Sequence, residues 1–305
     1  MKVTSTIKLP KTLRRSIPFP KLYGLLVARN ESDVIRDCLM HALGHCDKII
    51  AMDSMSDDAT WQIITDMADQ YPQQIIAHAR LETPFNEGLR AIGYNAFHHE
   101  LSGADWWLRL DADEFLNADP AGVLALANHE RVDFVRANQM NFELTDLDAA
   151  AIESGADLWR RPIWQRRLYY RVNQREFRMF RNNPDCKWDR MADSRFPQTL
   201  SEKLVCSRDV FNRRYATRDI EPVKKRLAPR IRPEEFQHLQ DKDWKRRLTK
   251  WSKCHRYDPG GSVHFRPFRD FWLHRIGAEI QRQVRNCLDF KRFWPLDSPK
   301  SGRAA

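Results

Sequence analysis

The segment LYGLLVARNES, residues 22–32, passes within a few positions from an uninterrupted apolar run to a polar tail. An apolar run of this length predicts a strand that is buried on both faces. Asn30, with Asp33 three residues later, predicts the cap of a helix in which apolar residues recur at helical spacing from Val34 to Leu43. The segment therefore predicts a strand, a tight loop and a helix, which together form the first unit of an α/β fold.

The same succession of strands and helices continues downstream. Pro72 ends one predicted helix, and Asp119 followed by Pro120 predicts the start of another, because aspartate caps a helix and proline fits its first turn. Almost wholly apolar strands that alternate with helices predict a Rossmann-like α/β fold, with a mostly parallel sheet covered by helices on both faces. Further strands are expected at 48–52, 74–79, 106–110 and 132–140, and further helices before Pro72, at 87–101 and at 119–129.

Charge is distributed unevenly along the chain. The 305 residues contain 51 Lys+Arg and 41 Asp+Glu, a formal net charge of +10. Residues 1–157 contain 14 Lys+Arg against 24 Asp+Glu, a net charge of −10, whereas residues 158–305 contain 37 against 17, a net charge of +20. A strongly basic half indicates an anionic partner, such as substrate phosphates, an acidic membrane surface or nucleic acid.

The sequence also excludes several classes of protein. No apolar run approaches the roughly eighteen residues of a membrane-spanning helix, and the basic N-terminal segment lacks the apolar stretch of a signal peptide. Six cysteines without paired spacing fit a reducing compartment, so a cytoplasmic protein is expected. The absence of Gly-x-Gly-x-x-Gly, of a P-loop and of Gly-x-Ser-x-Gly argues against dinucleotide oxidoreductases, P-loop NTPases and α/β-hydrolases.

Carboxylates directly follow two of the predicted strands. Asp53 follows the strand at 48–52, and the run Asp111-Ala112-Asp113-Glu114 follows the strand at 106–110. Because the carboxyl ends of parallel strands meet at one edge of a sheet, these acids are expected to converge. Taken singly, each acid also fits an ordinary turn or cap. Together they fit a Mg²⁺ or Mn²⁺ ion that bridges to a substrate diphosphate, since such ions take one or two carboxylates plus phosphate oxygens.

Four motifs in order along the chain resemble those of the family 2 glycosyltransferases. They are LLVARNES (25–32), IIAMDSMSDDAT (49–60), the arginine within NEGLRAIGYNAF (86–97) and WWLRLDADEF (106–115). The resemblance, which is weak after about residue 145, implies the GT-A fold and the transfer of a sugar from a nucleoside-diphosphate sugar to a hydroxyl, with inversion at the anomeric carbon. It implies a glycan or lipid-linked acceptor and a role in cell-surface polysaccharide synthesis.

Three divisions of the chain are expected. Residues 1–20 would form an extended basic arm, and residues 21–205 the nucleotide-sugar-binding GT-A catalytic domain. Residues 206–305 would form a basic, aromatic and mainly helical C-terminal extension.

Individual residues take roles from the same resemblance. Ala28 and Glu31 would lie in the loop that holds the base and ribose of the nucleotide. Asp53 would accept a hydrogen bond from the base, which favours a UDP-sugar, and Arg90 would face the nucleotide or its diphosphate.

The acidic motif after the strand at 106–110 matches the family's metal-binding Asp-x-Asp, which implies Mn²⁺ or Mg²⁺ as cofactor. Asp113 would be the direct metal ligand, and Asp111 would be shared between metal and ribose. The chain departs from the family at Met55 and Ala59, where glycine is usual. This departure leaves the shape of that turn and the identity of the base open.

A carboxylate after the metal site is expected to act as the general base that takes the proton of the acceptor hydroxyl. Related enzymes for bacterial envelope sugars carry an arginine-containing strand and then a tryptophan followed by His-Glu. Residues 177–194 contain such a strand and Trp188, but Asp193 and Ser194 stand where His-Glu is expected. Asp193 is the first candidate for the base and Asp189 the second. The alternative is that both are surface acids of a loop.

The basic half contains a further predicted element. Apolar residues recur at intervals of four from Phe268 to Val284, which predicts an amphipathic helix with a basic face. This helix would either pack as core or bind anionic lipid headgroups and so hold the enzyme peripherally at the inner face of a membrane. The arginines upstream of it are expected either on the surface or facing the diphosphate or an acidic acceptor. They are Arg160, Arg161, Arg166, Arg167, Arg171 and Arg175.

Two other functions stay open. A nucleic-acid-binding protein could use the basic half to hold a single strand by charge and stacking, although this function does not account for the acidic residues of the first half. A nucleotidyltransferase also depends on Asp-x-Asp, but the segment ARNES stands where such enzymes usually carry a glycine-rich basic loop.

Overall fold

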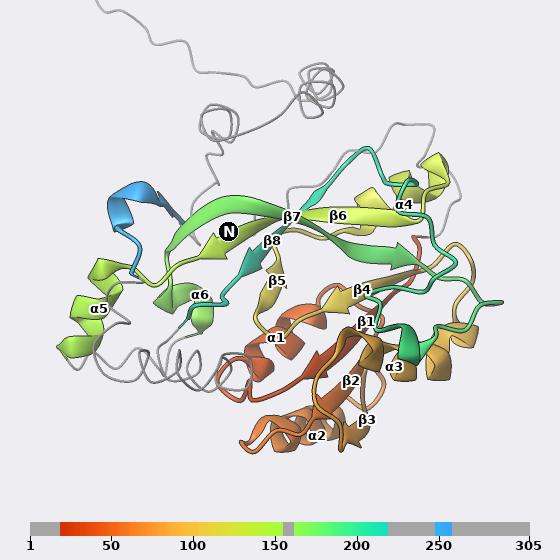
Figure 1. Cartoon of the computed structure of the whole chain (residues 1–305), viewed down its shortest axis with the longest axis horizontal. Helices are drawn as coiled ribbons and strands as arrows, with labels where there is room; N and C mark the ends of the chain where they lie inside the picture. The colour runs from red at the N-terminus through yellow and green to blue at the C-terminus, as the bar shows by residue number, and fades with distance from the viewer. Residues whose placement is uncertain (1–18, 155–161, 219–247, 258–305) are drawn as a thin grey trace, which may run out of the picture. The chain divides into compact units, whose positions relative to one another are not determined.

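A computed structural model describes residues 19–154, 162–218 and 248–257 (Figure 1). The expected N-terminal arm lies almost wholly outside these residues. Most of the expected C-terminal extension, including its amphipathic helix, also lies outside them.

The described strands form one nine-stranded sheet. Its first half is a parallel run in which β1 lies between β2 and β4, and β3 pairs with the far side of β2. The strands expected at 22–28 and 106–110 are confirmed to the residue. The parallel strands are β1 (Leu22–Ala28), β2 (Lys48–Ser54), β3 (Ile75–Leu81) and β4 (Trp106–Leu110).

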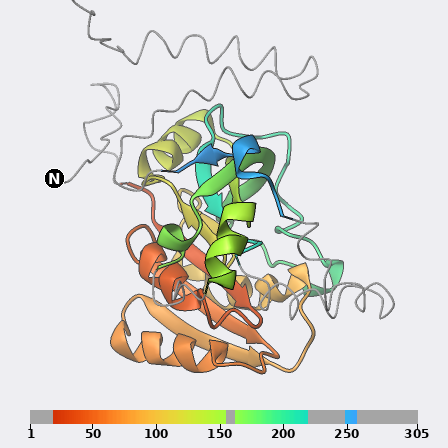
Figure 2. The same ribbon diagram turned by 90° about the vertical axis from the view of Figure 1, so that its left-hand side faces the viewer.

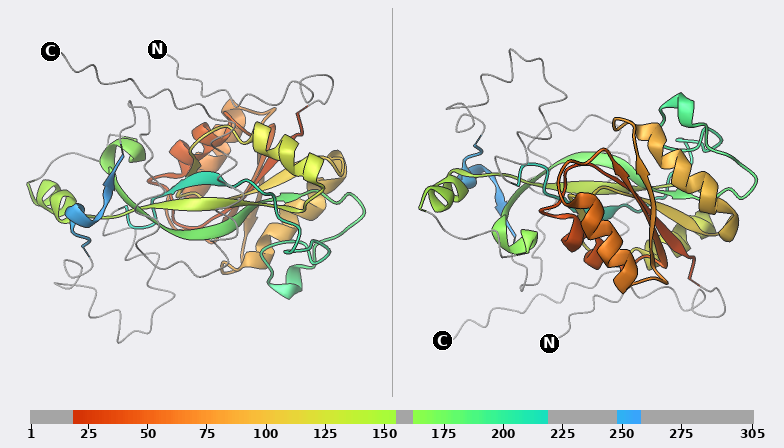
Figure 3. Two further views of the ribbon diagram at one scale, coloured as in Figure 1. Left: turned by 90° about the horizontal axis from the view of Figure 1, so that it is seen from above. Right: turned by 90° about the horizontal axis from the view of Figure 1, so that it is seen from below.

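The second half of the sheet is mixed, which corrects the expectation of a mostly parallel sheet. β7 runs antiparallel to both β4 and β6, while β8 runs parallel to β6 and antiparallel to β5. Polar residues interrupt β7, and this pattern belongs to antiparallel strands with one solvated face rather than to buried parallel ones. Figure 3 shows β6 and β7 side by side along their length. These strands are β5 (Glu114–Leu116), β6 (Phe134–Phe142), β7 (Tyr169–Arg181), β8 (Val210–Arg214) and β9 (His255–Arg256).

The sheet continues past the domain boundary expected at residue 205. β8 lies beyond that boundary and is hydrogen-bonded to both β6 and β5. The short β9 pairs with the start of β7.

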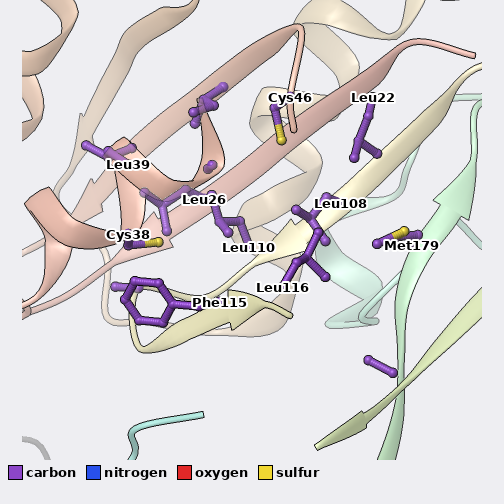
Figure 4. Packing of buried hydrophobic residues seen from close by; sticks show 14 of the residues in the cluster. Leu22, Leu26, Cys38, Leu39, Cys46, Leu108, Leu110, Phe115, Leu116 and Met179 are labelled. Atoms are coloured by element: carbon purple, nitrogen blue, oxygen red, sulfur yellow. The ribbon is translucent and has the colours of Figure 1, made fainter. Parts of the chain in front are cut away.

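Helices cover both faces of the sheet. The apolar sides of α1, α2 and α4 pack in one buried cluster with β1 and β4, where Figure 4 shows Leu26, Cys38 and Phe115 close together. Figure 2 shows α1 and α2 side by side. On the opposite face α3 packs through Ala91 and Tyr94 in a second cluster. The helices are α1 (Ile35–Ala42), α2 (Thr60–Gln70), α3 (Arg90–Phe97), α4 (Ala121–Glu130), α5 (Asp146–Glu153) and α6 (Ile163–Arg166).

Two details of the helix predictions are corrected. The helix expected at 87–101 is divided into a 3₁₀ turn η2 (Glu87–Leu89), α3 and a second 3₁₀ turn η3 (His98–Glu100). The predicted cap of α1 is wrong, since Val34 precedes the helix without a side-chain cap. Asn30 lies in the loop before the helix and adopts a left-handed backbone conformation with φ of 53°.

Among the described residues, no helix has both the length and the apolar character needed to cross a membrane.

Gly93 of α3 lies close against side chains of β1 and β2. A β-carbon there would lie 2.7 Å from Leu25 Cδ1 and 3.0 Å from Met52 Cε. Gly93→Val is therefore expected to destabilise the fold by about 1–3 kcal/mol through overpacking. Gly103→Val is the control, because a β-carbon at Gly103 meets nothing within 4 Å. Urea unfolding of both variants tests the packing, and equal stabilities would contradict it.

Candidate active site at the carboxyl edge of the parallel strands

The carboxyl ends of β1, β2 and β4 meet at one edge of the sheet. In the β1–β2 register, Ala28 lies opposite Asp53, and in the β1–β4 register Leu110, the last residue of β4, lies opposite Leu26. Asp111 follows Leu110 directly. The structure therefore brings Ala28, Asp53 and the acidic turn after β4 to one place, as the sequence predicts.

Asp53 is fully buried, and its two carboxylate oxygens differ in their partners. Oδ2 accepts a hydrogen bond from the Ser56 backbone N–H at 3.1 Å and lies 3.6 Å from Arg80 Nε. Oδ1 has no hydrogen-bond partner among the described residues. A buried acceptor without a partner is costly, so Oδ1 is an atom that the N–H group of a ligand would satisfy.

The turn after Asp53 contains Met55 in the left-handed region, with φ of 57°. Glycine is favoured in this region because it has no β-carbon, which accounts for the glycine usual in the resembling family. Side chains tie this turn to the loop after β1: Ser56 Oγ accepts from the Asn30 N–H at 2.9 Å, and Asn30 Oδ1 accepts from the Asp57 N–H at 3.0 Å. The two loops therefore form one unit.

Glu31 lies in the loop after β1 and is held by Arg218, a residue that the sequence analysis did not single out. Arg218 is buried; it donates to Glu31 and, through Nε and Nη2, to both carboxylate oxygens of Asp33 at 2.7 Å. The Glu31 backbone N–H donates to Thr60 Oγ1 at 2.8 Å. Arg218 is 187 residues away from Glu31 along the chain, and no local pattern could have indicated this contact.

Asp111 lies among three arginines. Arg90 Nη2 donates to Oδ1, Arg178 Nη1 donates to Oδ2 at 2.6 Å, and Arg109 Nη2 lies 3.6 Å from Oδ2. Burial by itself would raise the pKa of Asp111, but the guanidinium groups of Arg178, Arg90 and Arg109 outweigh it and hold this pKa well below its usual range. Asp111 therefore stays ionised, with both oxygens oriented by arginines.

Arg178 of β7 joins three carboxylates. Besides Asp111 it donates to Glu114 and, at 3.0 Å, to Glu176, while only 1% of its side chain is exposed. Glu114 is itself buried and accepts from Asn212 at 2.5 Å. Burial raises the pKa of Glu114, and the nearby negative charges add to this effect against the opposing charge of Arg178. The sequence indicated an arginine-containing strand here, but not which arginine would face inward.

The acidic turn has a donor set that suits a hard divalent cation bound jointly with a ligand. Asp113 is 5% exposed, and its carboxylate is of the type that Mg²⁺ and Mn²⁺ prefer. Within the described ranges, no group of three or more His, Cys, Asp or Glu side chains could hold a metal ion. An ion at this turn would therefore need phosphate oxygens and water to complete its coordination.

The two candidates for a general base have different environments. Asp193 adopts a left-handed conformation with φ of 44°, and its Oδ1 accepts from the Gly88 N–H at 3.3 Å. Glu87, the neighbour of Gly88, accepts from Arg90 at 2.5 Å, so Asp193 is connected to the acidic turn through η2. Asp189 instead caps the 3₁₀ turn η4 (Arg190–Ala192) by accepting from the Met191 N–H at 2.9 Å.

Comparisons with known proteins add little at the level of sequence. No family model matches the chain, and no curated protein matches it. Among solved structures, the mannosyltransferase PcManGT from Pyrobaculum calidifontis, in complex with GDP-Man and Mn²⁺, is 13% identical with a TM-score of 0.34, covering 75% of this chain and 72% of that one. A mycobacterial protein is 18% identical with a TM-score of 0.27, covering 46% and 50%. With TM-scores this low, neither structure assigns a function to this chain.

Replacement of Arg178 by methionine is expected to destabilise the protein by about 3–5 kcal/mol, because it leaves buried carboxylates without their shared cation. Arg171→Gln, on the same strand, is the control. Arg171 is 45% exposed and pairs with Glu143, so its loss should cost less than about 1 kcal/mol. Urea unfolding at pH 7 measures both variants. A loss for Arg178→Met no larger than that of the control would show that the buried pairing contributes little.

Proposed function

We propose that this chain is a metal-dependent, inverting glycosyltransferase of the family 2, GT-A type. The observation that carries the proposal is the carboxyl edge of β1, β2 and β4. There a buried Asp53 oxygen without a partner lies on the strand next to Ala28, and an acidic turn follows the neighbouring β4. Ligands of open α/β sheets bind at such edges.

The nucleotide is proposed to bind with its base against Asp53. Oδ1 is a buried acceptor, and the imide N–H of uracil is a donor that would satisfy it. A UDP-sugar is therefore the favoured donor substrate. Ala28 and Glu31 would line the base and ribose, and Arg218 positions Glu31 by holding it together with Asp33.

The diphosphate is proposed to bind at the acidic turn. Asp113 would hold the Mn²⁺ or Mg²⁺ ion together with phosphate oxygens, while Asp111, oriented by Arg90 and Arg178, would face the ribose. A bound divalent ion would offset the negative charge that develops on the leaving nucleoside diphosphate.

Asp193 is proposed to act as the general base. As the acceptor hydroxyl oxygen bonds to the anomeric carbon, Asp193 takes the hydroxyl proton, and the bond from that carbon to the diphosphate oxygen breaks with inversion. The Gly88 N–H donates to Oδ1 of Asp193 and so orients the carboxylate. Asp189 is the second candidate: it accepts from Met191 within its own turn, whereas Asp193 is connected through Gly88 and Glu87 to Arg90 beside the acidic turn.

The acceptor is proposed to be a hydroxyl of a glycan or lipid-linked saccharide in cell-surface polysaccharide synthesis. The enzyme is proposed to be cytoplasmic, and the net charge of +20 on residues 158–305 supports peripheral binding to an anionic membrane surface.

A thermal-shift titration with UDP, GDP and CDP, each with Mn²⁺, Mg²⁺ or EDTA, tests the donor site. A ligand that binds only the folded state raises the melting temperature, so UDP with metal is expected to give the largest shift. Asp113→Asn should lose the metal dependence and sugar transfer while keeping the fold. Asp66→Asn, an exposed aspartate on α2, is the control. The absence of a shift with every nucleotide would overturn the donor site, and full activity of Asp113→Asn would overturn the metal assignment.

Asp193→Asn tests the general base. Asparagine tolerates the left-handed conformation of this position, so the loop should keep its shape. Sugar transfer is expected to fall about 10²-fold or more with an unchanged nucleotide-induced thermal shift, whereas Asp189→Asn should keep most of its activity. A loss confined to Asp189→Asn would transfer the role to that residue.

A further inference from the structure

A second feature adjoins the acidic turn: a cavity of about 570 Å³. It lies between the loop 194–202 and residues of β4, β6 and β7. Its lining residues are Arg109, Phe134, Arg136, Arg175, Glu176, Phe177, Ser194, Arg195, Phe196, Pro197, Gln198, Leu200 and Glu202. None of the residues proposed for the nucleotide or the metal belongs to this lining.

Three aromatic rings form the apolar part of the cavity. Phe134 lies with its ring centroid 4.7 Å from that of Phe177 and 5.0 Å from that of Phe196. Aromatic side chains next to a few polar groups are typical of pockets for small organic ligands. The C–H faces of a sugar ring are apolar enough to pack against such rings.

The charged part of the cavity is mainly cationic, with four arginines against two glutamates. Glu176 accepts from Arg109 at 3.0 Å and also from the buried Arg178, so its charge is already compensated. Glu202 is exposed. The lining therefore presents more guanidinium than carboxylate groups to a ligand.

Two of these guanidinium groups, those of Arg109 and Arg136, have a buried Nε that forms no hydrogen bond in the described part of the chain. Arg136 Nε forms an ion pair with Asp209 Oδ1 at 3.4 Å, and Asp209 also binds Arg175 at 2.5 Å, so two guanidinium groups share this one carboxylate. Arg195 is 57% exposed, and its Nε lies 3.7 Å from Glu87. Because Asp209 is shared between two arginines and Arg195 is exposed, the guanidinium charge of the lining is only partly offset, and an anion in the cavity would offset it further.

Two residues of the lining connect the cavity to the proposed site of transfer. Ser194 of the lining directly follows Asp193, the proposed base. Arg109, which also lines the cavity, lies 3.6 Å from Asp111. The cavity therefore shares a loop with the proposed base and an arginine with the acidic turn.

We propose that this cavity is the acceptor site and that it takes a sugar carrying a negative group, either a carboxylate or a phosphate. The sugar ring would pack on Phe177 and Phe196, and Arg136 and Arg195 would bind the anion, because guanidinium groups match carboxylate and phosphate geometry. As the acceptor site for a transferase, the assignment rests on the proposed function.

Binding of three small probes tests this proposal without catalysis. Methyl β-D-glucuronide, methyl β-D-glucoside and methyl β-D-glucoside 6-phosphate differ only at carbon 6 and can be titrated by NMR. At least one anionic probe is expected to bind about tenfold more tightly than the neutral glucoside, and the comparison of the two shows whether carboxylate or phosphate is preferred. High salt should reduce this preference, since exposed charges are screened.

Two variants test whether Arg136 and Arg195 bind the anionic group of the probe. Arg195→Gln together with Arg136→Gln should abolish the preference for the anionic probes. Asp209 keeps Arg175 as a partner in this variant, so no carboxylate is left unpaired. Arg171→Gln, which changes an arginine of β7 outside the lining, should keep the preference. Equal binding of charged and neutral probes, or a preference that survives the double substitution, would overturn the proposal.

The donor titration on the same protein separates the two proposals. A metal-dependent nucleotide shift without any preference for anionic glycosides would overturn the acceptor proposal alone. An anionic preference without any nucleotide shift would overturn the proposed function and leave the cavity as an anion-binding site for sugars.

Discussion

The structure of the candidate site depends on one buried guanidinium group, that of Arg178. It joins Asp111 at the end of β4, Glu114 at the start of β5 and Glu176 on its own strand β7. Carboxylates this close together in a buried environment repel one another and resist ionisation. The shared cation makes their proximity possible, and it does so by connecting the parallel half of the sheet to the mixed half.

The two halves of the sheet contribute different parts of the site. The parallel strands β1, β2 and β4 end together. This places Asp53, proposed to bind the base of the nucleotide, next to Ala28 and near the acidic turn. β6 and β7 supply Phe134, Phe177 and the arginines of the neighbouring cavity. The antiparallel pairing of β4 with β7 holds these two regions side by side, so a donor and an acceptor could meet at their border.

Arginines also fix the loops of the site. Arg218 connects the segment after β8 to the loop after β1 by binding Glu31 and Asp33. Arg90 connects η2 and α3 to Asp111, and the neighbouring Gly88 orients Asp193. Charged contacts of this kind are costly to bury unless they are paired, so loss of one partner is expected to destabilise the loop that it holds.

The sequence by itself determined the first half of the fold and most of the acidic residues of the site. The strand at 22–28 is an apolar run and the strand at 106–110 is apolar except for Arg109, and their ends mark Ala28 and Asp111 without knowledge of any distant contact. Such local patterns are sufficient because hydrophobic periodicity and residues at strand ends are properties of neighbouring positions.

The tertiary structure decided the features that depend on contacts between distant parts of the chain. The antiparallel direction of β7, the inward position of Arg178 and the contact of Arg218 with Glu31 depend on residues up to 187 positions apart. The cavity arises in the same way, from β4, β6, β7 and the loop 194–202. These features follow from which strands become neighbours, and that choice is made by the free energy of the whole packed sheet rather than by any one segment.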